Sequence, residues 1–257
     1  SKVEMTYTYP TPTTIDVFYT NAEGYLVTPE KLPYGKGYSL VEVSAPYGYV
    51  LNDEPVYFDV TEDNSSEESA VTVVVVERPN MAQKGVINIT KTGEVFSTVT
   101  ESSGVYQPVY EVKGIAGAVY EITAAEDIIT PDGTLRYAKG TVADTVTTDE
   151  NGNAESGPLY LGKYTVRETK APYGMVLNGT EKTVELTYAG ETVEITETAA
   201  EFYNDRQNAV LSLSKILGKD EIFGIGNNGE ILSVQFGLYA AEEIVSTDEI
   251  RRTNQFT

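Results

Sequence analysis

Cysteine, histidine and tryptophan are all absent from this sequence of 257 residues. Without cysteine, no disulfide can stabilise the fold in any compartment. Without histidine, the sequence lacks the commonest general base and the commonest metal ligand, and it can hold no Ser-His-Asp or Cys-His arrangement. These absences argue against most hydrolytic and metal-dependent enzymes. We therefore expect no enzyme, no cofactor and no metal site.

Positive charge is scarce, because 18 Lys and Arg residues face 39 Asp and Glu residues and the formal net charge is −21. A surface of this kind repels nucleic acid and anionic membranes, so neither is an expected partner. No apolar run approaches the length of a membrane span, and the first residues show no basic region followed by an apolar core. We expect any localisation signal to lie outside this chain. A hydrophobic content of 40% can still support a packed core.

The sequence does contain an internal repeat. The stretch YTVRETKAPYGMVLN at Tyr164–Asn178 recurs as YSLVEVSAPYGYVLN at Tyr38–Asn52, an offset of 126 residues from Glu42 to Glu168. Three further pairs of stretches have similar spacings: Val86–Glu94 with Val210–Gly218, the stretch ending at Asn80 with that around Asn204, and Val119–Ile128 with Gln235–Ile244. Four pairs at similar spacings indicate an array of repeats.

The order of these stretches predicts three domains. Residues 84–207 hold all of them and form the complete domain. Residues 1–83 hold only the last two, as the C-terminal part of a first domain would. Residues 208–257 hold only the first two, as the N-terminal part of a third domain would.

The expected fold class is all-β, with tandem antiparallel β-sandwich domains of immunoglobulin-like or prealbumin-like type, one complete and two truncated. Short β-rich runs alternate with turn sequences such as Pro131-Asp132-Gly133 and Glu150-Asn151-Gly152. Val71–Val76 is a predicted strand, Thr92–Tyr110 a predicted long hairpin, and Ala124–Ile129 a predicted short helical turn.

Three polar residues of the complete domain fall on apolar strand faces. Glu168 alternates in step with Tyr164 and Val166, Lys91 shares a face with Ile87 and Ile89, and Asn204 shares a face with Phe202. A charged group on an apolar face is costly unless it has a partner. Three inward polar residues from three strands are compatible with one buried cluster of Lys91, Glu168 and Asn204. The alternative is a lysine at a strand end and two surface polar residues, which is the commoner arrangement for any one of them taken alone.

The lysine strand, the YxVxETxAPxGY box and the asparagine strand together resemble the B-type repeat domains of gram-positive collagen-binding adhesins and pilins, also called CnaB-like, SpaA-like or prealbumin-like domains. The resemblance covers nearly the whole chain. It implies an autocatalytic intramolecular isopeptide bond between Lys91 and Asn204, with Glu168 in the catalytic role. Burial disfavours charged forms, so the lysine can act as a neutral amine and the glutamate as a neutral acid.

The flanking copies carry incomplete half-sites by the same comparison. Glu42 and Asn80 match the assisting residue and the acceptor of a first domain, and Lys215 matches the nucleophile of a third. The expected function is a structural stalk or adhesin segment of a bacterial cell-surface protein, attached to the cell wall of a gram-positive organism. Its expected partners are neighbouring repeats of the same polypeptide, with host matrix protein or glycan bound through other parts of the full protein.

Two alternatives stay open from the sequence. A β-sandwich module that binds carbohydrate or a host protein could use some of the nineteen tyrosines. The stretch Asp149–Asn153 has oxygen ligands spaced somewhat as in a calcium loop, but it lacks the twelfth-position glutamate and the flanking helices, so a hairpin turn is favoured.

Overall fold

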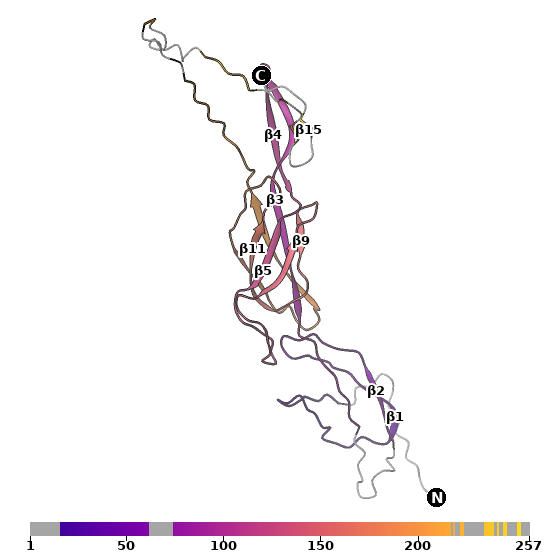
Figure 1. Ribbon diagram of the computed structural model, residues 1–257. Coiled ribbons are helices and arrows are strands. Elements are labelled where there is room, and N and C mark those ends of the chain that lie inside the picture. Colours follow the sequence, from indigo (N-terminus) through magenta and orange to yellow (C-terminus); the bar gives the residue numbers. More distant parts are fainter. Residues whose placement is uncertain are drawn as a thin grey trace, which may run out of the picture. The chain divides into compact units, whose positions relative to one another are not determined.

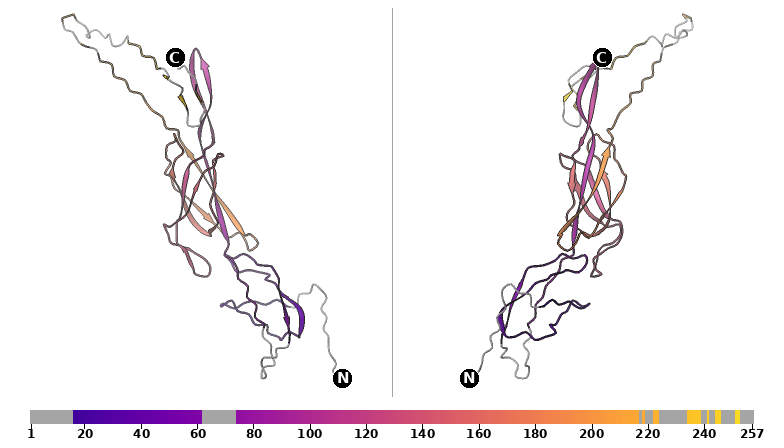
Figure 2. Two further views of the ribbon diagram at one scale, coloured as in Figure 1. Left: turned by 45° about the vertical axis from the view of Figure 1, so that its right-hand side comes forward. Right: turned by 180° about the vertical axis from the view of Figure 1, so that it is seen from behind.

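The computed structural model describes residues 16–61, 74–216, 218, 222–223, 234–238, 241, 244–245 and 251–252. Strands and turns account for all the regular structure in these residues, and Figures 1 and 2 show them from three sides. None of the described residues lies in a helix that could span a membrane. The all-β prediction is therefore confirmed. The chain divides into two compact units, residues 1–43 with 52–79 and residues 44–51 with 80–257.

The first unit contains one antiparallel pair, β1 (Gly35–Leu40) with β2 (Val56–Val60). The rings of Tyr38 and Phe58 face each other across this pair, with centroids 5.6 Å apart. The predicted strand at Val71–Val76 falls partly on residues 71–73, which lie outside the described residues. Residues 74–76 form no strand, so that part of the prediction is wrong.

The second unit contains two main sheets. One consists of β3 with neighbours on both edges, and the other has the order β12-β11-β5-β8. The strands of the first sheet are β3 (Lys84–Ser102), β4 (Val105–Gly114), β9 (Asn153–Glu155), β10 (Leu159–Tyr160) and β13 (Ile195–Asn204). Those of the second are β5 (Val119–Ala124), β8 (Val142–Thr147), β11 (Gly162–Lys170) and β12 (Lys182–Leu186). Two short pairs complete the unit: β6 (Ile128–Ile129) with β7 (Leu135–Tyr137), and β14 (Ile244–Val245) with β15 (Arg251–Arg252).

The pairing of β3 with β13 is parallel, whereas the other strand pairs among the described residues are antiparallel. Its register runs from Lys84 opposite Ile195 to Gly93 opposite Asn204. Parallel neighbours need a long connection, and here nearly the whole domain lies between the two strands. The first and last strands of the repeat therefore lie side by side and run in the same direction.

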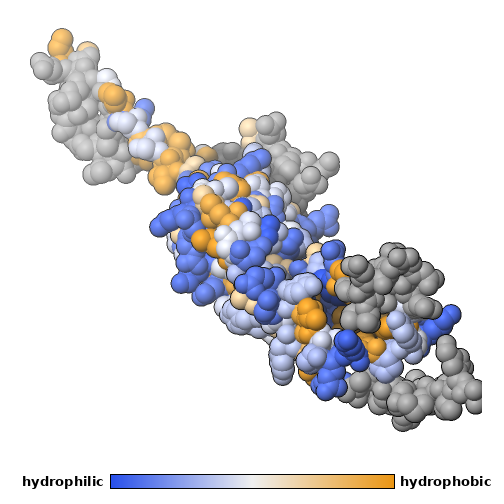
Figure 3. All heavy atoms as spheres, turned by 90° about the horizontal axis from the view of Figure 1, so that it is seen from below, coloured by the Kyte–Doolittle hydropathy of each residue, from blue (hydrophilic) through white to orange (hydrophobic). Residues whose placement is uncertain are grey.

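The core of the second unit lies between the two sheets. β3 contributes Ile87 and Ile89, and the facing sheet contributes Tyr120, Tyr164 and Val166, all with an exposure of 1% or less. Each set alternates with less buried residues, which is the period of two that a half-buried strand requires. The polar residues predicted to face inward lie on these same strands. Figure 3 shows a face of the molecule where hydrophilic residues predominate over small groups of hydrophobic ones.

The predicted hairpin at Thr92–Tyr110 is confirmed, since β3 pairs with β4 from Thr92 to Ser102. Ser103 and Gly104 join the two strands with φ angles of 55° and 80°, as a tight two-residue hairpin turn requires. The predicted helical turn at Ala124–Ile129 is wrong. Ile128 and Ile129 instead form β6, because the following Pro-Asp-Gly turn folds the chain back onto β7.

Candidate functional site

Lys91 lies on the buried face of β3 and its side chain has no solvent exposure. Its backbone is held from two sides: the N–H donates to the carbonyl of Gly152 at 2.7 Å, and the carbonyl accepts from the N–H of Ile115 at 3.1 Å. Thr148 supports the same region, because its hydroxyl donates to the carbonyl of Ile115 at 2.8 Å. These backbone contacts fix the position of the lysine Cα independently of the contacts of its side chain.

Glu168 lies on β11, in the facing sheet, and is 2% exposed. It continues the inward face of Tyr164 and Val166, so strand alternation alone brings its carboxylate into the core. One carboxylate oxygen, Oε2, accepts a hydrogen bond from the N–H of Asn178 at 2.8 Å. This contact ties the glutamate to the chain that follows the Pro-Tyr-Gly turn.

Asn204 is the last residue of β13 and is 1% exposed. Its amide Nδ2 donates to both carboxylate oxygens of Glu168, at 2.9 Å to Oε1 and 3.0 Å to Oε2. Its amide oxygen accepts a hydrogen bond from the Nζ of Lys91. The carboxamide is thus held at both ends, with its nitrogen toward the glutamate and its oxygen toward the lysine.

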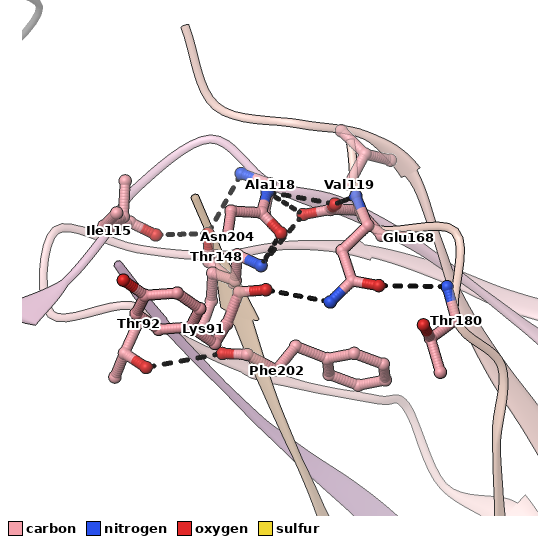
Figure 4. A network of polar contacts seen from close by, with 12 residues as sticks. Lys91, Thr92, Ile115, Ala118, Val119, Thr148, Glu168, Thr180, Phe202 and Asn204 are labelled. Atoms are coloured by element: carbon pink, nitrogen blue, oxygen red, sulfur yellow. Dashed lines mark hydrogen bonds and ion pairs between the residues drawn. The ribbon is translucent and has the colours of Figure 1, made fainter. Parts of the chain in front are cut away.

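The structure brings Lys91, Glu168 and Asn204 together, and Figure 4 shows them within one network of polar contacts. The third side of the triangle is an ion pair of 3.3 Å between Lys91 Nζ and Glu168 Oε1. Burial lowers the pKa of Lys91 below its usual value, and the nearby negative charge of Glu168 opposes part of that effect. An amine with a lowered pKa, an amide carbon next to it and a carboxylate in contact with both are the groups that acyl transfer from amide to amine requires.

Tyr120 is a fourth member of the cluster that the sequence reasoning missed. It lies directly opposite Glu168 in the pairing of β5 with β11, and it is fully buried. Its hydroxyl makes no hydrogen bond of normal geometry within the described residues. Burial, and then the charge of Glu168, raise the pKa of the Tyr120 phenol far above its usual value, so it stays neutral. The signal in the sequence was the alternation of Ala118, Tyr120 and Ile122, which places the tyrosine on the inward face.

The proposed half-site residues have the following places. In the first unit, Glu42 Oε2 accepts from the N–H of Asn52 at 2.9 Å, the same contact that Glu168 makes with Asn178. In the second unit, the Nδ2 of Asn80 donates to the carbonyl of Val50 at 3.1 Å. Lys215 is exposed on a segment without regular structure.

The stretch Asp149–Asn153 folds as a turn. The carboxylate of Asp149 accepts from the N–H groups of Asn151 and Asn153, at 2.9 and 2.8 Å. The residues that the structure describes hold no group of His, Cys, Asp and Glu side chains arranged for a metal ion. The carboxylate is therefore used to close the turn that supports Lys91.

Comparison with known proteins adds a family to this geometry. The model of the SpaA family, described as a prealbumin-like fold domain, matches residues 1–73 and 109–200, which is more than half of the chain. No curated protein matches.

Several solved structures resemble the chain. They include the minor pilin GBS52 of Streptococcus agalactiae, with 16% identity, a TM-score of 0.32, and coverage of 52% of this chain and 49% of that one. The Bacillus anthracis TIE protein has 27% identity, a TM-score of 0.39, and coverage of 68% and 26%. The major pilin SpaD of Corynebacterium diphtheriae has 22% identity, a TM-score of 0.32, and coverage of 48% and 30%. The chain spans half or less of the length of each of these proteins.

Proposed function

The chain belongs to the SpaA family of prealbumin-like fold domains, and on that premise we propose that it is a structural stalk or adhesin segment of a gram-positive surface protein. We further propose that residues 84–207 are locked by an isopeptide bond between Lys91 and Asn204. The observation that carries the proposal is the contact of three fully buried polar side chains between facing sheets. Burying three such groups is costly because they lose their hydration. A chemical role for the cluster would explain why the fold keeps them buried.

The bond would form in one acyl-transfer step. A proton moves from Lys91 Nζ to the Glu168 carboxylate, and the neutral amine attacks Cγ of Asn204. The new bond joins Nζ to Cγ, the bond from Cγ to Nδ2 breaks, and the nitrogen leaves as ammonia with protons relayed by Glu168. The double hydrogen bond from Nδ2 to Glu168 supports this role, because it places the carboxyl group that would deliver the proton next to the leaving nitrogen. Fixed geometry provides the high effective concentration that a slow reaction needs.

The proposed reaction occurs once per molecule, so it is a maturation step and not turnover. The proposed location at the cell wall, and any binding of host matrix protein or glycan, would depend on other parts of the full protein. Covalent locking would also take the place of disulfides, which a chain without cysteine cannot form.

Intact mass tests the bond directly. The full chain is expected to weigh about 17 Da less than its sequence predicts, for one ammonia released. Glu168→Ala should restore the full mass, because the proton relay is removed. Glu201→Ala, at an exposed position of β13, is the matched control and should keep the loss. A full mass for the unaltered chain would refute the bond.

A further inference from the structure

Gln83 is a buried glutamine with no role in the cluster described above. It is 1% exposed and lies just before β3. Its Oε1 accepts from the N–H of Ala189 at 2.9 Å, and its Nε2 donates to the carbonyls of Gly190, at 2.9 Å, and Val193. One side chain thus satisfies three backbone groups of the turn that joins β12 to β13. We name residues 188–193 the basal turn.

A second element lies on the basal turn. Residues 44–51, named here the first AP turn, belong to the same compact unit. The side chain of Glu191 accepts from the N–H of Ala45 at 2.7 Å, and the backbone carbonyl of Glu191 accepts from the N–H of Leu51 at 2.8 Å. The first AP turn comes from the preceding copy of the repeat, so the basal turn of one copy receives the AP turn of another.

Aromatic packing adds to these hydrogen bonds. The rings of Tyr47, in the first AP turn, and Tyr188, in the basal turn, have centroids 4.6 Å apart at an angle of 57°. Desolvation raises the pKa of the Tyr188 phenol, and Glu191 and Tyr47 add to that shift. The contact therefore combines ring packing, backbone hydrogen bonds and one buried amide.

The complete repeat has its own copy of the surface that the first AP turn and Gln83 form. Residues 170–177, named here the second AP turn, have the same backbone arrangement as the first. The N–H of Gln83 donates to the carbonyl of Gly48 at 2.8 Å. The N–H of Gln207, 124 residues later, donates to the carbonyl of Gly174 at 2.9 Å. Both turns are thus presented in the same way next to a glutamine.

The two surfaces differ in what covers them. Gln207 is exposed, and within the described residues its side chain makes no hydrogen bond. Val176 and Leu177 are 46% and 51% exposed. Their counterparts in the first AP turn, Val50 and Leu51, are half-buried. The second surface presents the same backbone hydrogen-bonding groups as the first, and among the described residues no basal turn packs on it.

We propose that the second AP turn and Gln207 form a docking surface for the basal turn of a following copy of the same repeat. The occupant has a stated chemistry: a tyrosine to pack on Tyr173, backbone groups to pair with the Gln207 amide, and a carboxylate like that of Glu191. Lys170 stands where the first AP turn has Ser44, and its positive charge suits that carboxylate. Docking does not require the bond between Lys91 and Asn204, so the two proposals can fail separately.

A chain with one repeat duplicated tests this surface. Residues 1–207 are followed by a second copy of residues 84–257, so that Gln207 stands before a new copy of β3 as Gln83 stands before the first. Hydrogen exchange of the peptide that contains Ala189 then reports both basal turns together. Gln107→Ala, at an exposed glutamine of β4 in both copies, is the matched control.

With Gln83 and the joining Gln207 intact, both copies of the peptide that contains Ala189 are expected to be protected from exchange. Replacing the single Gln207 that joins the two repeats by alanine should make about half of the peptide exchange roughly tenfold faster or more, because one hydrogen bond to Ala189 is lost. Gln83→Ala should release the other half, and the control should release none. A duplicated chain in which half of the peptide is unprotected from the start would overturn the proposal. So would full protection after the replacement of Gln207.

Discussion

At the scale of single residues, the decisive property is the complete burial of the Lys91 side chain. An ammonium group in a dry core loses its hydration, so burial lowers the pKa of the lysine although Glu168 lies 3.3 Å away. The phenol of Tyr120 stays neutral beside the carboxylate of Glu168, so it adds no second negative charge that would favour the charged form of Lys91. The neutral amine that the proposed attack on Asn204 needs is therefore easier to form here than on a surface lysine.

Asn204→Ala should expose this effect as a pH dependence of stability. The variant cannot form the bond, so Lys91 stays titratable. Its pKa in the folded state lies below the unfolded value, so the unfolded chain binds more protons in the window between them. The free energy of unfolding should rise with pH through that window, up to about pH 10.5. Urea unfolding measured between pH 7 and 10 checks this, against Lys91→Met in the same background, in which the rise should disappear.

At the scale of elements, the turn at residues 149–153 holds β3 in place. Gly152 has a φ of 78°, and a Cβ there would lie 2.2 Å from the carbonyl oxygen of Lys91 and 2.6 Å from the Cα of Gly114. Only glycine fits both the positive φ and this close approach. The Asn-Gly sequence predicted a turn, but the packing of that turn against the backbone of Lys91 needed the tertiary structure.

Gly152→Ala is therefore expected to destabilise the fold strongly. Gly133 is the matched control, because its φ is 82° and nothing lies within 4 Å of its would-be Cβ. Gly133→Ala carries only the backbone cost, about 1 kcal/mol. Gly152→Ala carries that cost and a backbone clash, so its loss in the free energy of unfolding should be several times larger. Equal losses in urea unfolding would contradict an added cost from the close approach at Gly152.

At the scale of the whole repeat, the parallel pair of β3 and β13 sets the path of a mechanical load. The N-terminal end of β3 and the C-terminal end of β13 lie at opposite ends of the pair, so pulling on both loads the strands in shear. A bond from Lys91 to Asn204 would carry the load directly from the first strand to the last. The chain between them, which makes up most of the repeat, would then bear none of it.

Single-molecule pulling should measure this difference. The two residues of the proposed bond are 113 positions apart, so a repeat locked by that bond could not release the chain between them. Asn204→Ala should add a step of roughly 400 Å in contour length, at about 3.6 Å per residue. Glu201→Ala, at an exposed position of β13, serves as the control and should add no step. A step of that size in the unaltered chain would contradict the locked repeat.

Strand alternation made much of this structure predictable. A period of two placed Glu168 on the same strand face as Tyr164 and Val166. The long hairpin predicted at Thr92–Tyr110 is the pair of β3 and β4. The predicted helical turn at residues 124–129 is wrong because Ile128 and Ile129 pair with β7, and that pairing is a tertiary contact which local propensity does not encode. The sequence did not predict a place for Tyr120 in the cluster, because that place depends on which residue of β11 lies opposite it. The sequence of a single strand does not determine this register.

The sequence by itself determined the all-β class, the repeat and the inward faces of Lys91, Glu168 and Asn204, because these follow from local period and spacing. Only the tertiary structure decided that the three side chains meet, since they come from strands in two different sheets. It alone decided that β3 and β13 run parallel, and that Gln83 is buried while Gln207 is exposed. These two glutamines occupy equivalent positions of the repeat, and their exposure differs because the basal turn packs against Gln83.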